Sequence, residues 1–437
     1  MLPLLFLVSC FWDTPAKAPR LIVIGIDGLG TAHLESLDRQ GRVPNLAKLA
    51  RQGVFSEIKS VTPLVSPVIW TSIGSGMRAK KHGVEGWFVD DGSGAPRLVD
   101  ARHVRVRRYW EILAERGVST TTLGWLAMFP LAPSSDLAVT TDVFWDRVLV
   151  QKVEGNSVLD GDRAPLSLNP RSAASWVLEQ RLDPAKAAKG PLGYQFPHTP
   201  LDDHPVLRDA WVINTAVESQ ARDPAEVLTL YVKGIDELAH LFLPFTDAAF
   251  VRRMKLNPKT YAEDSRMVPD VDLPWEGEAL TDERLEIGAR IVDDYLAWLD
   301  GALAPVLALA GPDTNIVIVS DHGMLLTTMP PAENGALGIP RPDHDPIATL
   351  IMSGPAIKAG TKLKSPSLLD VTPTILHVLG QPVAKDMDGR VLSEALHQPG
   401  EVQWVDSYDT RKRTLPEVPA LASDPEVERL RALGYVQ

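Results

Sequence analysis

Short apolar runs alternate along the chain with segments in which apolar residues recur at helical spacing. Continuous apolar or β-branched runs predict strands at 21–26, 119–128, 227–232, 315–320 and 347–352. The segments between them predict helices at 44–52, 109–116, 206–222, 282–299 and 366–379. Strands that are apolar throughout are typical of a parallel sheet covered on both faces. The pattern therefore predicts an α/β fold with a mostly parallel central sheet and helices on both faces.

The longest predicted helix also has a clear beginning. Thr281 is expected to cap it, with Asp282 and Glu283 in the electropositive first turn. One face is expected to be buried, at Leu285, Ala289, Val292, Leu296 and Leu299.

Two regions interrupt the alternation of strands and helices. Residues 141–205 and 244–275 are polar, rich in Pro and Asp, and only weakly periodic. We interpret them as cap insertions over the sheet within a catalytic domain at 21–400, the alternative being surface loops without a role. Residues 401–437 form a C-terminal extension, in which 426–436 is predicted to be a short amphipathic helix.

The first residues resemble a secretory leader. Residues 1–12 are apolar but too short to span a bilayer, and Leu7-Val8-Ser9-Cys10 resembles a bacterial lipobox. Residues 1–20 are thus expected to be a signal and tether, with Cys10 lipidated and the protein anchored in a bacterial envelope, facing the periplasm or the exterior. No basic residue precedes Cys10, which departs from this pattern. The alternative is a frayed end in which Cys10 has no role.

The composition excludes several kinds of partner and metal site. The formal net charge is −12, which argues against a nucleic-acid polymer as a partner. Cys10 is the only cysteine, so the chain has neither a disulfide framework nor an all-cysteine zinc site. A metal ion would have to be held by His and carboxylates. The sequence does not indicate an oligomeric state.

Acidic and imidazole side chains stand at the predicted strand ends. Asp27 follows the strand 21–26, and Asp321 and His322 follow the strand 315–320. Side chains just past the carboxyl ends of parallel strands point into the crevice where α/β proteins bind ligands. Taken singly, each signal is weak, because Asp-Gly is also a common turn.

Two further groups have metal-ligand character. Asp236 and His240 follow the strand 227–232 at an i, i+4 spacing, which places both on one face of a helical turn. His344 lies shortly before the strand 347–352. A lone histidine is more often a satisfied polar residue, but all of these groups adjoin predicted strands.

Together these motifs resemble the alkaline phosphatase superfamily, and within it the type I phosphodiesterase/nucleotide pyrophosphatase branch. The matching segments occur in the family's order, as IGIDG at 24–28, SP…GSG at 66–76, KHG at 81–83, GIDELAH at 234–240, SDHGM at 320–324, His344 before SGPAIKAG, and LLDVTPTILHVLG at 368–380. The resemblance covers about residues 20–395 and implies two divalent metal ions at the carboxyl edge of the sheet.

The resemblance also implies which residues hold these ions. Asp236, His240 and His344 would hold one, and Asp27, Asp321, His322 and the nucleophile the other. Zinc suits mixed Asp/His ligation best, with manganese or iron as alternatives. Two bound ions would give the pocket a positive charge, so that an acidic protein could bind a small phosphate ester.

The resemblance identifies the nucleophile less directly than the metal ligands. The family places a Ser or Thr in a turn that opens a helix, and Ser66, ten residues before Gly76, has this position. Its spacing is also similar to that of the serine in cofactor-independent phosphoglycerate mutases. Thr71 and Thr62 are alternatives, and Ser66 could also be a helix cap. Ile69 stands where the family has a phosphate-binding Asn, so that group is not evident.

Two other motifs are interpreted as structural. His82-Gly83 is shared with the family but is not a ligand there. Residues 386–389 superficially resemble a calcium loop but lack its remaining oxygen ligands, so they are expected to form a turn.

The sequence therefore favours a phosphodiesterase or nucleotide pyrophosphatase that acts through a covalent intermediate on Ser66. A phosphomonoesterase, phosphonate hydrolase or phosphotransferase on the same site is the first alternative. A sulfatase is disfavoured, because Val65 and Ile69 do not fit the sulfatase motif around Pro67. An envelope lipoprotein that has lost catalysis and only binds its ligand is an alternative of another class.

Overall fold

The computed structural model describes residues 17–89, 97–132, 136–140, 168–180, 205–256, 281–328 and 340–416. Cys10, the lipobox and the predicted C-terminal helix at 426–436 lie outside these residues, as do most of the predicted insertions. Within the described part of the chain, no helix combines the length and the apolar character needed to cross a membrane.

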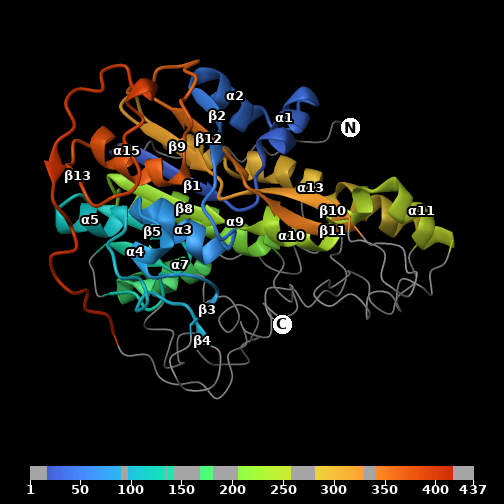
Figure 1. Cartoon of the computed structure of the whole chain (residues 1–437), viewed down its shortest axis with the longest axis horizontal. Coiled ribbons are helices and arrows are strands. Elements are labelled where there is room, and N and C mark those ends of the chain that lie inside the picture. The colour runs from blue at the N-terminus through green and yellow to red at the C-terminus, as the bar shows by residue number, and fades with distance from the viewer. Residues whose placement is uncertain are drawn as a thin grey trace, which may run out of the picture.

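The main sheet has the strand order β2-β12-β9-β1-β8-β5-β6-β7 (Figure 1). β9, β1, β8, β5 and β6 are parallel to one another, whereas β12 runs antiparallel to β9 and β2, and β7 antiparallel to β6. The strands are β1 (Leu21–Ile26), β2 (Val54–Lys59), β5 (Thr120–Leu123), β6 (Leu137–Val139), β7 (Leu168–Asn169), β8 (Val227–Val232), β9 (Asn315–Val319) and β12 (Ile347–Ser353).

Helices cover both faces of this sheet. The helices are α1 (Thr31–Arg39), α2 (Pro44–Gln52), α3 (Ser66–Ser75), α4 (Ala79–His82), α5 (Tyr109–Glu115), α7 (Ala174–Glu179), α9 (Pro205–Arg222), α10 (Gly234–Phe242), α11 (Ala248–Leu256), α13 (Asp282–Ala302), α14 (Ala304–Leu307) and α15 (Val371–Val378). The described residues also include the short 3₁₀ segments η2 (Arg171–Ala173), η3 (Leu243–Thr246), η4 (Leu368–Asp370) and η5 (Ser393–Ala395). This confirms the predicted α/β architecture.

β1 shows why its run is apolar throughout. Ile22, Ile24 and Ile26 pack in a core with helices that include α2, α9 and α13, whereas Leu21 and Val23 pack in a second core with α3, α5 and α15. Successive side chains of a strand point to opposite faces, so a strand between two helical layers needs apolar residues at every position.

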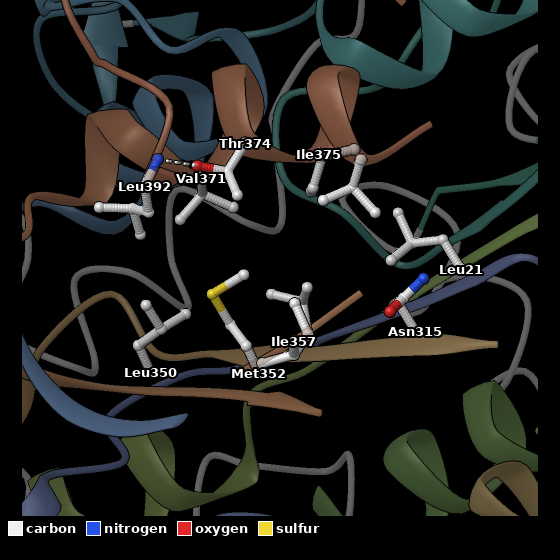
Figure 2. A pocket seen from close by; sticks show the side chains of 11 residues that line it. Leu21, Asn315, Leu350, Met352, Ile357, Val371, Thr374, Ile375 and Leu392 are labelled. Atoms are coloured by element: carbon white, nitrogen blue, oxygen red, sulfur yellow. Dashed lines mark hydrogen bonds between the residues drawn. The ribbon is translucent and has the colours of Figure 1, made fainter. Parts of the chain in front are cut away.

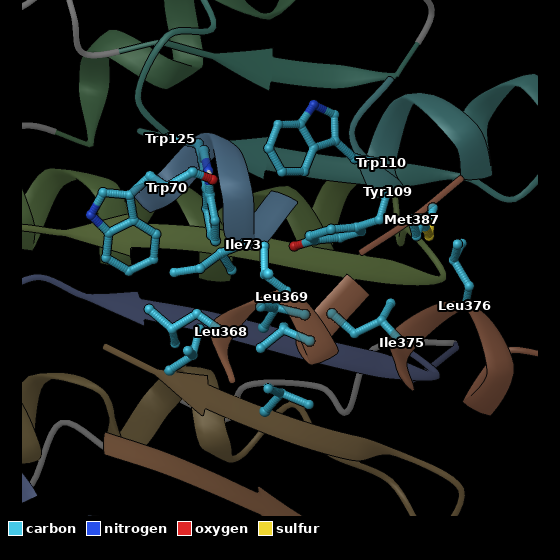
Figure 3. Close-up of a cluster of buried hydrophobic side chains, with 14 of the residues drawn as sticks. Trp70, Ile73, Tyr109, Trp110, Trp125, Leu368, Leu369, Ile375, Leu376 and Met387 are labelled. Atoms are coloured by element: carbon cyan, nitrogen blue, oxygen red, sulfur yellow. Dashed lines mark hydrogen bonds between the residues drawn. The ribbon is translucent and has the colours of Figure 1, made fainter. Parts of the chain in front are cut away.

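The second core is rich in aromatic side chains (Figure 3). Trp70 of α3 meets Trp125 edge to face, with ring centroids 4.9 Å apart, and Tyr109 and Trp110 of α5 complete the cluster. Figure 2 shows a cavity of about 10 Å³ between α15 and the sheet. Its lining is almost wholly apolar. The Thr374 hydroxyl in this lining is already paired, because it accepts a hydrogen bond from the Leu392 amide at 2.9 Å and donates one to the Asp370 carbonyl. It is a packing gap.

In the part of the chain that the structure describes, three small two-stranded sheets lie outside the main one. They pair β3 (Phe88–Val89) with β4 (Arg97–Leu98), β10 (Gly323–Thr328) with β11 (Pro340–Asp345), and β13 (Val383–Ala384) with β14 (Trp404–Val405). β10 and β11 carry the chain away from the carboxyl end of β9 and back, and they contact η3.

Two local predictions are wrong. Of the strand predicted at 119–128, only β5 is a strand in the structure. Gly124 adopts φ +77°, and the apolar residues after it are buried in the aromatic core and not in a sheet. In α13, Ala289 is exposed and Gly288 is buried in its place, where a Cβ atom would lie 2.8 Å from Phe245. The predicted Thr281 cap is confirmed, since its hydroxyl accepts from the Arg284 amide at 3.2 Å.

The described parts of the predicted insertions have defined places. β7, at residues 168–169, adds an edge strand to the main sheet next to β6. η3 and α11 fall within the second predicted insertion, and η3 packs against α13 and the β10–β11 hairpin.

Candidate metal centre

The residues predicted at three strand ends converge at one edge of the sheet. β9, β1 and β8 are neighbours and parallel, so their carboxyl ends meet. Asp27 follows β1, Asp321 follows β9, and Asp236 lies in the first turn of α10 directly after β8. His322 and His240 continue the last two segments.

These residues form two groups of three. Within each group, every residue offers one potential ligand atom, and the three atoms lie within 4.8 Å of one another. We call Asp27, Asp321 and His322 the inner triad, and Asp236, His240 and His344 the outer triad. The inner triad is almost completely buried, whereas the histidines of the outer triad are partly accessible.

The inner triad surrounds a single point. The His322 Nε2 atom lies 3.4 Å from Asp27 Oδ1 and 3.3 Å from Asp321 Oδ2. These three buried atoms make no hydrogen bond to the described residues. Buried polar atoms are nearly always paired in proteins, so three converging unpaired ones are typical of a site built for a ligand or an ion.

Hydrogen bonds hold the other atoms of these side chains. Asp27 Oδ2 accepts from Trp70 Nε1 at 3.2 Å and from the Tyr231 hydroxyl. Asp321 Oδ1 accepts from the backbone amides of Gly28 and His322 at 3.2 and 3.0 Å. Each carboxylate is thus fixed through one oxygen, and its second oxygen is directed into the triad.

The histidine tautomers are set in the same way. His322 Nδ1 donates to the Gly323 carbonyl at 3.0 Å, and His344 Nδ1 donates to the Leu64 carbonyl at 3.0 Å. A ring that is protonated on Nδ1 leaves Nε2 as the electron-pair donor. Backbone carbonyls behind metal-binding histidines commonly have this function.

The outer triad is assembled from two distant segments. His240 Nε2 lies 3.3 Å from Asp236 Oδ1, as expected for an i, i+4 pair on α10. His344 stands on β11, opposite Met324, and its Nε2 atom lies 3.5 Å from the same carboxylate oxygen and 3.0 Å from His240 Nε2. The β10–β11 hairpin therefore brings the third residue to the site.

The two triads adjoin. His322 Nε2 lies 3.8 Å from Asp236 Oδ1, and the His322 and His344 rings stack with centroids 3.8 Å apart. Gly28 permits this closeness, because it has φ +75° and a Cβ atom there would lie 3.0 Å from the Asp236 Cα atom. Any other residue would push the loop after β1 away from α10.

The charges of the buried carboxylates oppose one another. Burial, together with the charge of Asp236, raises the pKa of Asp27 to about 7. Burial and the charges of Asp27 and Asp236 raise the pKa of Asp321 well above its usual value. Burial alone would also raise the pKa of Asp236, but His240 and His344 outweigh it and lower that pKa well below its usual value. A divalent cation would relieve this repulsion.

The donor set therefore fits divalent ions. Three carboxylates and three histidines supply oxygen and imidazole ligands, which suit zinc and other first-row metals. The unpaired atoms of the inner triad converge on one point, and the scaffold hydrogen bonds leave the ligand atoms of both carboxylates available.

Ser66 is at the start of α3, in a segment that contacts both triads. It is the first residue of the helix and is 2% exposed. Two residues before it, the Leu64 carbonyl binds His344 of the outer triad, and four residues after it, Trp70 binds Asp27 of the inner triad. Residues four apart share a helix face, so Ser66 lies on the face of α3 that meets Asp27.

The alternatives to Ser66 lie elsewhere on this segment. Thr62 is exposed in the loop before α3, and Thr71 is buried on a different face of the helix. The helix cap is Val65, and Ser66 forms no capping hydrogen bond, so a capping role is not observed. Ile69 is fully buried and has no group that could bind phosphate.

The two motifs interpreted as structural meet near the end of α3. His82 is buried, contacts the Ser72 hydroxyl through Nε2 at 3.0 Å, and accepts from the Val84 amide at 3.1 Å. Residues 386–389 form a turn in which the Asp388 amide donates to the Gly76 carbonyl, and Lys81 contacts the Asp388 carboxylate. Both tie the segment after α3 to the rest of the domain.

The sequence did not reveal the residues behind α10. Arg208 of α9 is buried and makes two contacts with Glu237, at 2.9 and 2.7 Å, and one with Asp209 at 3.2 Å. Asp209 in turn accepts from the Gly234 amide at 2.9 Å and from the Tyr295 hydroxyl. This network holds the first turn of α10, which carries Asp236. Nothing local in the sequence distinguishes these charged residues from surface ones.

Comparison with protein families gives a match that covers most of the chain. The model of the family "Type I phosphodiesterase / nucleotide pyrophosphatase" matches residues 21–337. This range includes both aspartates and the histidine of the inner triad, and Asp236 and His240 of the outer triad.

Individual proteins are also similar to parts of the chain. A 2,3-bisphosphoglycerate-independent phosphoglycerate mutase of Cereibacter sphaeroides is 33% identical over 82 residues, which are 18% of this chain and 15% of the mutase. Crystal structures of phosphonoacetate hydrolase from Sinorhizobium meliloti, with phosphonoformate or phosphonoacetate, have a TM-score of 0.42 and 16% or 17% identity. They cover 72% of this chain and 59% of the hydrolase, so the chain spans less than two thirds of either protein.

Proposed function

The chain belongs to the type I phosphodiesterase/nucleotide pyrophosphatase family, and from this premise we propose that it is a metal-dependent hydrolase of phosphate diesters. The observation that carries the proposal is the pair of adjoining triads at the carboxyl edge of the sheet. Asp27, Asp321 and His322 would hold one divalent ion, and Asp236, His240 and His344 a second one. Zinc is the expected metal.

Such ions would lower the pKa of a hydroxyl group beside them and stabilise negative charge on the phosphoryl oxygens. The chain itself supplies the orientation. Tyr231 and Trp70 fix Asp27, and the Leu64 and Gly323 carbonyls fix the two histidine tautomers. These groups are in place before a substrate binds, which reduces the reorganisation that the reaction requires.

Ser66 is the proposed nucleophile. Its Oγ atom would form a bond to phosphorus while the bond from phosphorus to the first alcohol breaks. Water would then hydrolyse the serine phosphoester and release the second product. The support is the position of Ser66 at the start of α3, between the contacts of that segment to His344 and to Asp27.

The first test compares bis-para-nitrophenyl phosphate with para-nitrophenyl phosphate, using zinc-loaded protein. Faster cleavage of the diester is expected. Faster cleavage of the monoester by orders of magnitude would overturn the diesterase assignment in favour of the monoesterase alternative. Absence of turnover on a broad panel of phosphate and phosphonate esters, with ligand still bound, would favour the inactive binding protein.

The nucleophile is tested separately. Ser66→Ala should abolish turnover while the zinc content, measured by elemental analysis, stays unchanged. Thr71→Val and Thr62→Val are matched controls that remove the alternative hydroxyls and should retain activity. Full activity of Ser66→Ala would refute the assignment, and loss of activity in one control alone would transfer the role to that threonine.

A further inference from the structure

A second cavity, of about 390 Å³, lies against α5, β5 and β6, and no residue of either triad lines it. Its lining includes Thr122 and Ala138, which are paired neighbours on β5 and β6, and Trp110 and Ala114 of α5. Residues 411–415, which we call the strap, complete it. In Figure 1 α5 and the end of the red C-terminal segment lie well to one side of β10 and β11. The volume is in the range of small-molecule sites.

The lining carries a surplus of positive charge. Its charged residues are Arg107, Arg108, Arg411, Lys412 and Arg413 against Glu111, Glu115 and Asp136. Ion pairs join Glu111 with Arg108 and Arg413, and Glu115 with Arg107.

Two cationic side chains of the strap are not paired with a carboxylate among the described residues, so they are available to a ligand. Arg411 and Lys412 are exposed, and their side chains make no ion pair or hydrogen bond with any described residue. Because the internal cations are already paired with carboxylates, these two side chains define where a negative charge would bind.

The rest of the lining combines apolar side chains with one buried hydroxyl. Ala138 and Leu415 are half-buried and offer apolar surface, whereas Trp110 and Met128 are buried, at 5% and 2% exposed. The Thr122 hydroxyl in the same lining is buried and has no hydrogen-bond partner among the described residues. Charged and apolar side chains share this lining, so a matching ligand would need both an apolar body and a charged group.

We propose that this cavity binds a small organic anion, with an apolar body beside Ala138 and Leu415 and an acidic head group at Arg411 and Lys412. The ligand class is an aromatic or aliphatic carboxylate, sulfonate or phosphate. This site is distinct from the metal centre, and the proposal does not depend on the reaction proposed there.

Isothermal titration calorimetry with 2-naphthoate, naphthalene-2-sulfonate, 2-naphthyl phosphate and the neutral 2-naphthamide tests the proposal. The protein is Ser66→Ala, so that the phosphate ester is not turned over. Because two exposed cations contribute modestly, the acids should bind about tenfold more tightly than the amide. Added salt should reduce this difference. The order of the three acids identifies the preferred head group.

Variants locate the binding site. Ala138→Leu and Ala114→Leu, made separately, each place a larger side chain in the cavity and should weaken naphthoate binding. Arg411→Gln/Lys412→Gln should reduce the acids to the affinity of the amide. Lys358→Gln/Lys362→Gln removes the same charge from exposed residues outside the lining and should leave binding unchanged.

Three results would overturn the proposal. These are equal affinity for acid and amide, full naphthoate binding by both leucine variants with unchanged melting temperatures, and loss of binding in Asp236→Asn. The last result would place the probe in the metal centre. Unchanged binding in Asp236→Asn supports a separate site, whether or not the protein proves to be a diesterase.

Discussion

Arg208→Met should both destabilise the protein and weaken zinc binding at the candidate metal centre. The Arg208 side chain is 2% exposed and is the only described cation that contacts both Glu237 and Asp209. Methionine retains much of the apolar stem but removes the guanidinium, which leaves two carboxylates buried beside the first turn of α10.

The structure sets the size of the effect. Removing one partner of a buried ion pair costs about 3–5 kcal/mol. Glu237 keeps a contact with Lys233 at 3.2 Å, and Asp209 keeps the Gly234 amide and the Tyr295 hydroxyl. These remaining partners favour the lower end, about 3 kcal/mol. Because the disturbed turn carries Asp236, zinc affinity should fall roughly 10- to 100-fold, as for other residues that support metal ligands.

Urea denaturation and competitive zinc titration measure the two effects. Arg222→Met is the matched control, since Arg222 lies on the same helix α9 in an exposed pair with Glu218. Its loss should cost less than about 1 kcal/mol and leave zinc affinity unchanged. Arg208→Met/Glu237→Met should be more stable than Arg208→Met, because it removes a carboxylate that would otherwise be buried without its main partner.

Equal urea midpoints for Arg208→Met and Arg222→Met would refute the reasoning about burial. A large loss of stability with unchanged zinc affinity would show that the network supports the fold but does not position the metal ligands.

Three other predictions concern the same domain. Tyr231→Phe removes a hydrogen bond to Asp27 of the inner triad and should lower zinc affinity about 10-fold. Tyr109→Phe is the control and should leave zinc affinity unchanged, because the Tyr109 hydroxyl pairs with a threonine of β8. Equal zinc affinities of the two variants would contradict the role of Tyr231. Gly28→Ala should lower both the melting temperature and zinc occupancy, because its Cβ atom would meet the outer-triad aspartate; Gly41→Ala, with a similar φ but nothing within 4 Å, should affect only the melting temperature, and identical effects would exclude the steric explanation. Burial alone would raise the pKa of Glu111, but two arginines lower it to about 2, below its ordinary 4.5, so this carboxylate stabilises the protein above pH 4.5 and loses that effect as the pH falls toward 2. The stability deficit of Glu111→Gln in urea should therefore be largest near neutral pH and shrink below pH 4.5, and a deficit independent of pH would contradict the assignment.

Local patterns predict much of the fold and most of the candidate ligands. β1 and β8 are located to the residue, because a strand between two helical layers must be apolar throughout. The same rule fails after Gly124, where Trp125 is apolar for a different reason, namely burial against α3 from a loop. Periodicity detects burial but does not identify the neighbour that causes it.

The candidate ligands follow from strand ends and helical spacing, which are also local. Asp27 and Asp321 stand directly after apolar strands, and Asp236 and His240 share one helix face. His344 is different, because it reaches the outer triad only through the β10–β11 hairpin. Its function could be predicted only through the family resemblance.

The sequence by itself thus determined the order of the elements, the fold class and the residues with metal-binding chemistry. Tertiary structure alone decided that Tyr231 and Trp70 hold Asp27, that Arg208 fixes α10, and that the strap closes a cavity over α5. The physical reason is distance along the chain. Helix and strand patterns come from neighbours within a few residues, whereas these contacts join segments far apart in sequence and exist only once the sheet and its two helical layers have packed.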